Sequence, residues 1–223
     1  MIIMKKQLWI KSSIALLLTL AFTAGTPAQE MTRFAAVPGK SKVQIDGTST
    51  IHDWIVESHL VVGSVELDPT FPTDPAEKPA AAGKVNAKVD LSIPVRQLKS
   101  GKKPMDEVMY EAMNQKTFPK IEYHLTEMVL KEIPAASSAT LQFDTKGELT
   151  VSGVTNKISM PVTMQRIDKT QLRFTGSTAL KMTSYGIKPP APKIALGFIT
   201  TGDDIKITFD WLTAVPAKPS AAP

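Results

Sequence analysis

The chain contains no cysteine, which excludes disulfides, thiol nucleophiles and thiolate metal ligands. It also excludes the bacterial lipoprotein route, in which a lipid is attached to a cysteine. Only three histidines are present, His52, His59 and His124, although a metal site needs three or four ligands. The sequence has neither a G-x-S-x-G nucleophile turn nor a phosphate-binding glycine loop. We therefore expect no enzyme, no cofactor and no metal site.

Aromatic residues and excess charge are also scarce. Aromatic residues make up 6% of the chain. The net charge of +5 depends on three lysines near the N-terminus, and without them 23 basic residues face 21 acidic ones. Proteins that bind nucleic acids carry a strongly basic surface. We therefore exclude nucleic acid as a partner.

Long apolar runs are absent beyond the N-terminal region. The run at residues 14–24 is shorter than the roughly 20 residues that span a bilayer. It follows three lysines and precedes the small residues of 26–28, an order typical of a secretory signal peptide. We assign 1–28 to a signal peptide and expect a periplasmic or secreted protein. A membrane anchor that is retained is the alternative.

Alternation of apolar and polar residues is the dominant pattern of the remaining chain. In 147–161 it continues on both sides of a turn at Gly153, with Thr155 and Asn156 as turn-tolerant neighbours. This period of two is typical of antiparallel strands with one buried face. The same pattern predicts eight strands, at about 42–47, 54–67, 84–93, 118–131, 141–151, 158–165, 171–182 and 205–211.

The period changes to that of one amphipathic helix within 95–117, between the third and fourth strands. Pro104 suits the first turn, and Asp106 and Glu107 favour the N-terminal end of the helix dipole. One face collects apolar residues at helical spacing: Met105, Val108, Met109, Ala112 and Met113. The methionines fit either an adaptable lid over an apolar ligand or ordinary core packing.

Eight alternating strands without a βαβ rhythm predict an all-β, closed antiparallel barrel. The interior of such a barrel holds side chains or one ligand, and the predicted inward faces carry almost no charge. The expected barrel lining, and candidate ligand-binding set, is Trp54, Val56, Leu60, Val89, Leu91, Tyr123, Phe143, Leu149, Val151, Met160, Val162, Phe174, Phe209 and Trp211.

Two segments resemble the YceI-like family of secreted bacterial proteins. They are F-P-K-I-E-Y at 118–123 and G-E-L-T-V-S-G-V-T-N-K-I-S-M-P at 147–161. The resemblance implies a lipocalin-like, up-and-down β-barrel over 29–213 that holds a long apolar lipid. A polyisoprenoid or an isoprenoid quinone is the expected ligand, carried or stored by the protein. A packed barrel that serves as a structural or protein-interaction module without ligand is the alternative. Transient membrane contact is an expectation, and the oligomeric state stays open, with a dimer among the alternatives.

Three further segments carry predictions. His52-Asp53 invites a catalytic or metal-binding interpretation, but neighbouring residues of a strand point to opposite faces, so we favour a turn-capping role. The proline-rich segment 68–83 is a loop, and a solvated insertion is favoured over a flap at the barrel mouth. The Pro/Ala-rich tail, 214–223, is expected to be disordered.

Overall fold

The computed structural model describes residues 30–194 and 197–217. The expected signal peptide lies outside these residues, and so does the end of the tail, whereas Ala214 still belongs to the last strand. The elements are β1 (Thr32–Ala36), β2 (Lys42–Ser49), β3 (Trp54–Ser58), β4 (Val62–Leu67), β5 (Gly83–Lys84), β6 (Ala87–Pro94), η1 (Val95–Gln97), α1 (Lys103–Ala112), β7 (Lys120–Leu130), β8 (Thr140–Val151), β9 (Val154–Arg166), β10 (Gln171–Lys181), η2 (Met182–Tyr185), β11 (Lys193–Ile194), β12 (Gly197–Phe198) and β13 (Thr201–Ala214).

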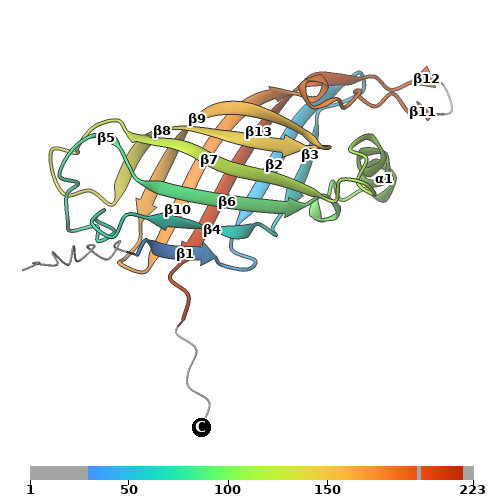
Figure 1. The fold of residues 1–223 in the computed structure, drawn as a ribbon. Helices are drawn as coiled ribbons and strands as arrows, with labels where there is room; N and C mark the ends of the chain where they lie inside the picture. The colour runs from blue at the N-terminus through green and yellow to red at the C-terminus, as the bar shows by residue number, and fades with distance from the viewer. Residues whose placement is uncertain (1–29, 195–196, 218–223) are drawn as a thin grey trace, which may run out of the picture.

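Eleven of these strands join in one sheet that closes on itself (Figure 1). β13 pairs with β10 on one side, and on its other side it pairs with β2 and then with β1. β1 and β2 are therefore two pieces of one barrel strand, and β3 and β4 are two pieces of the next. The result is a closed, eight-stranded antiparallel barrel, and the predicted all-β barrel is confirmed.

The helix does not match its expected place in the strand order. Six strands precede α1, which lies between β6 and β7, because β1 was not predicted, the second expected strand is divided into β3 and β4, and the short β5 precedes β6. β1 lies before residue 42, where the first expected strand begins. α1 and the β11–β12 hairpin lie at one end of the barrel, and β5 lies at the other (Figure 1).

The expected strand 54–67 is broken by hydrogen bonds between one side chain and the backbone. The Ser58 hydroxyl donates to the carbonyl of Leu60 at 3.2 Å and accepts from its N–H at 3.2 Å, so these groups leave the ladder. Beyond the break the alternation changes phase, with Val61 buried and Val62 48% exposed. The prediction that Leu60 and Val62 share the inner face with Trp54 is therefore wrong.

The turn between β8 and β9 is a two-residue hairpin. Ser152 and Gly153 both have positive φ, 51° and 78°, as the tight turns favoured by hairpins require. Val151 pairs directly with Val154. Thr155 and Asn156 were expected beside the turn as turn-tolerant residues. Both belong to β9 instead.

The end of the barrel away from α1 is filled by side chains. Phe34, Phe143 and Met164 are each fully buried in this part of the core. The proline-rich segment 68–83 contributes to it, because the ring of Phe71 lies 6.2 Å from that of Phe143. The segment therefore packs over the filled end of the barrel, away from the cavity, and is not a plain solvated insertion.

A buried arginine holds this closing segment. Arg166, the last residue of β9, is 1% exposed. Its Nη1 donates to the backbone carbonyls of Pro72, Asp74 and Glu77 at 3.1, 2.8 and 2.9 Å, and its Nη2 donates to that of Ser138. Burial lowers the pKa of the Arg166 guanidinium. One side chain thus joins segments far apart in the sequence.

A candidate site in an apolar cavity

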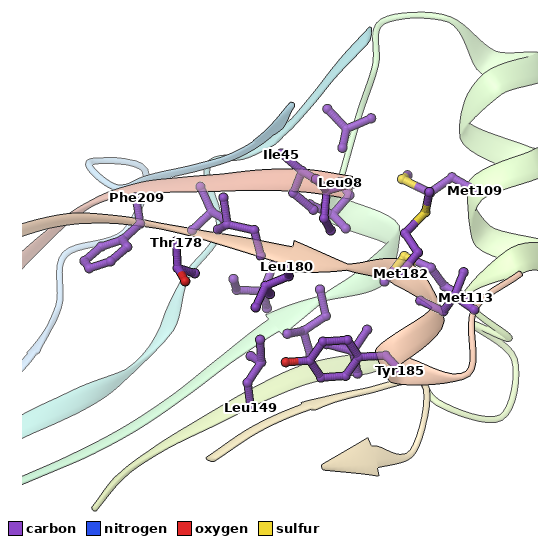
Figure 2. Close-up of a pocket in the computed structure, with 18 of the residues that line it drawn as sticks. Ile45, Leu98, Met109, Met113, Leu149, Thr178, Leu180, Met182, Tyr185 and Phe209 are labelled. Atoms are coloured by element: carbon purple, nitrogen blue, oxygen red, sulfur yellow. The ribbon is translucent and has the colours of Figure 1, made fainter. Parts of the chain in front are cut away.

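The half of the barrel nearer to α1 encloses a cavity of about 730 Å³. This volume lies within the roughly 300–1,000 Å³ of pockets that hold a single small ligand. Its walls are the inward-facing residues of the barrel strands, and its floor is formed by Phe174 and Trp211, whose ring centroids are 5.5 Å apart. Figure 2 shows the end of the cavity nearer to α1, where Met109 and Met113 of the helix lie beside Met182.

Helix α1 is fixed over the cavity by two polar residues on its other faces. The Asp106 carboxylate accepts from the N–H and the hydroxyl of Ser100 at 2.7 and 2.6 Å. The Tyr110 hydroxyl donates to the carbonyl of Leu98 at 2.8 Å and accepts from Nζ of Lys99 at 2.8 Å. All members of the predicted apolar face then line the cavity: Met105, Val108, Met109, Ala112 and Met113. This placement favours the lid over ordinary core packing.

Aromatic rings on the wall lie over glycines of neighbouring strands. A Cβ on Gly47 would stand 2.1 Å from the Trp54 ring, and one on Gly176 would stand 2.7 Å from that of Phe209. These contacts are possible because glycine has no side chain. The rings therefore lie flat against the wall and leave the centre of the barrel open.

Gly147 provides the same space for Tyr123, and we predict a measurable cost when it is filled. A Cβ at Gly147 would stand 2.4 Å from the Tyr123 ring, so Gly147→Ala must displace a buried ring toward the cavity. We expect a loss of about 1–3 kcal/mol in the free energy of unfolding, measured in urea. In the double variant with Tyr123→Ala the two costs should not add. A neutral Gly147→Ala would contradict this packing.

Among the residues whose side chains the structure describes, none places a charge in the interior of the cavity. The described lining contains four ionisable side chains, of which His52 and Lys102 are exposed at the rim. The other two are tyrosines, and burial raises the pKa of both Tyr123 and Tyr185, so their phenols stay neutral. Such a site can bind an apolar molecule but offers no ion pair to fix a charged group inside the barrel.

Twelve of the fourteen predicted lining residues lie on the cavity wall. Leu60 is excluded because the break after β3 changes the phase of the strand. Phe143 points inward, but it lies below the floor and packs against Phe71. The prediction missed the lining from the segments outside the expected strands, because these lack a periodic pattern: Leu98, Tyr185, Ile187, Pro190 and Ile199.

His52 lies at the rim in a capped turn. The Ser49 hydroxyl donates to the carbonyl of His52 at 2.7 Å and accepts from its N–H at 3.2 Å, and Nδ1 of His52 lies 2.7 Å from the carbonyl oxygen of Asp53. The cap is thus supplied by Ser49. Within residues 30–194 and 197–217 there is no group of three or more His, Cys, Asp or Glu that could hold a metal ion.

Comparison with known proteins places the chain in a family. A model of the YceI-like domain matches residues 34–212, which is most of the chain. The chain belongs to the YceI-like domain family. The resemblance of the two motifs is thereby confirmed. Comparison with curated proteins found no match to this YceI-like chain.

Solved structures agree with the YceI-like fold. BcnA of Burkholderia cenocepacia is 17% identical with a TM-score of 0.59, and the match covers 79% of this chain and 98% of BcnA. A polyisoprenoid-binding domain from Saccharophagus degradans, implicated in plant cell wall breakdown, is 11% identical with a TM-score of 0.59, and the match covers 84% and 100%. At these identities the likeness concerns the fold. In the described part of this YceI-like chain, neither α1 nor the 3-10 helices are long and apolar enough to cross a membrane.

Proposed function

We propose that this YceI-like protein is a secreted or periplasmic binding protein that carries or stores a long apolar lipid in its barrel. The observation that carries the proposal is the uncharged cavity of about 730 Å³. A barrel that served only as a packed interaction module would have no use for such a space, so the cavity weighs against that alternative. The proposal is of a binding protein and not of an enzyme.

The affinity would come from burial of hydrocarbon. Apolar surface contributes roughly 25 cal/mol per Å², or about 0.8 kcal/mol for each buried methylene. A chain of about twenty buried carbons would contribute roughly 16 kcal/mol, which still leaves the roughly 8 kcal/mol of micromolar affinity after a cost of immobilisation of about 8 kcal/mol. The methionines of α1 suit a flexible chain, because their unbranched side chains adapt to irregular shapes.

A polyisoprenoid or an isoprenoid quinone is the proposed ligand class. The support is the family membership together with the structural likeness to a domain that is described as polyisoprenoid-binding. Secretion rests on the leader-like residues 1–28 alone. Transient contact of the cavity mouth with a membrane would give such a lipid a route to the barrel, and a dimer is compatible with this role.

Native mass spectrometry of the protein exported with its own leader tests the proposal. We expect an added mass on the mature chain that solvent extraction releases as a prenyl lipid or quinone. A mature chain that carries no added mass, and that also takes up no added prenyl lipid, would contradict the proposal and favour the packed module.

A further inference from the structure

The barrel wall has a seam between β9 and β10 beside the cavity. The register of these strands begins at Arg166 with Leu172 and ends at Val162 with Gly176. Beyond this point residues 157–161 pair only with β8, and residues 177–181 pair only with β13. The seam therefore runs along the half of the wall that encloses the cavity.

Pro161 explains where the ladder ends. A proline has no N–H, so it cannot donate a hydrogen bond to a neighbouring strand. Its carbonyl oxygen would stand 2.9 Å from a Cβ on Gly176, which places the polar edge of Pro161 on the side of β10. The N–H that is missing is thus one that would have continued the ladder along the seam.

Apolar side chains that line the cavity flank the seam on both sides. Ile158 and Met160 come from β9, and Leu180 comes from β10. At the foot of the seam, a hollow on the outer surface is lined by Gly176, Pro161 and Phe209. Phe209 also lines the cavity, so the hollow and the interior share this residue.

The 3-10 helix η2 covers the seam near the mouth, and a side-chain hydrogen bond joins it to β9. Nδ2 of Asn156 donates to the carbonyl of Ser184 at 2.7 Å. The side chains of Met182 and Tyr185 in η2 are buried against the cavity wall (Figure 2). Behind η2, Gly186 adopts a left-handed φ of 69°, a conformation that glycine allows without strain.

We propose that the seam is a lateral portal, through which the ligand enters and leaves the barrel sideways, and that η2 is the gate of this portal. The inference rests on the proposed lipid-binding function. A long chain that leaves through a seam need not be drawn end-on past α1. Opening would break no ladder hydrogen bonds along the seam, because the strand edges there are unpaired, and it would require the Asn156 hydrogen bond and the packing of Met182 and Tyr185 to part.

Cross-linking tests the portal, because the chain has no cysteine of its own. Ser159→Cys with Ala179→Cys places two exposed thiols on opposite sides of the seam, to be bridged by a short bis-maleimide and verified by mass. The matched control is Thr163→Cys with Thr175→Cys, a directly paired position in the closed ladder between the same strands. The probe is a quinone with a four-isoprene tail in vesicles, and its exchange is followed by tryptophan fluorescence.

We expect the bridged seam variant to exchange the quinone at least tenfold more slowly than its unbridged form, with little change in the control pair. Independently, Asn156→Ala removes the clasp and should accelerate exchange several-fold without weakening equilibrium binding. Unchanged exchange in the bridged variant, or in Asn156→Ala, would overturn the portal. Failure of the wild-type protein to take up the quinone would instead contradict lipid binding itself.

Discussion

Ile207→Trp is expected to weaken lipid binding by roughly 50-fold while leaving the barrel folded. Ile207 lies on the cavity wall between the two clusters of the core, so an indole there projects into the middle of the space. It would displace about three methylenes of a bound chain, each contributing roughly 0.8 kcal/mol, and every 1.4 kcal/mol changes the dissociation constant tenfold. Isothermal titration calorimetry with a prenyl lipid measures the change.

Lys206→Trp is the matched control for this substitution. Lys206 is the neighbouring residue of β13, and it is exposed on the outer face of the barrel. The same side chain there should leave affinity unchanged. Equal losses in the two variants would contradict the assignment of the site to the cavity, and so would full affinity in Ile207→Trp.

Arg166→Ala is expected to lower the free energy of unfolding by about 3 kcal/mol, because it removes a buried side chain and leaves four partly buried carbonyls without their donor. The residue donates to four backbone carbonyls, three of them in the segment 68–83 that closes the filled end of the barrel. A cost of this size corresponds to a fall of roughly 6–12 °C in the melting temperature of a domain of this length. Urea unfolding and calorimetry measure both quantities.

Arg173→Ala is the control for the loss of an arginine from the surface. Arg173 lies on β10 and is half-exposed, and its Nε is 3.5 Å from Oδ1 of Asp210. Pairs of this kind contribute about 0–1 kcal/mol. We expect the Arg166 variant to be clearly less stable than the Arg173 variant. If the two were equally stable, Arg166 would not be the residue that holds the closing segment.

The alternation of side chains was enough to predict most of the wall. The pattern runs unbroken in β8 and in the part of β13 from Ile205 to Trp211, and Leu149, Val151, Phe209 and Trp211 all lie on the cavity as their phase predicts. The apolar face of the helix was also predictable, because its residues recur every three or four positions, as successive turns of a helix require. When a strand has one buried face, the position of one inward residue determines which of the other side chains face the core.

The failures arose where a local or distant hydrogen bond overrides the pattern. Ser58 breaks the second expected strand through hydrogen bonds to the backbone of Leu60. The sequence alone does not show whether a serine within a strand makes such bonds. The partners of Arg166 lie 28 to 94 residues away and are all backbone carbonyls, so their sequence identity carries no signal. The 3-10 helix η2 was missed for a related reason, since one short turn has no period.

The most direct test of the account is a titration of the leaderless protein with a quinone that carries a four-isoprene tail. The tryptophans beyond the leader are Trp54 and Trp211, and both line the cavity, so a ligand inside the barrel must affect their fluorescence. The account predicts saturable quenching with one quinone per chain, weakened in Ile207→Trp when the same titration is followed by calorimetry. Quenching that does not saturate, or no quenching at all, would contradict the claim that the barrel holds an apolar ligand.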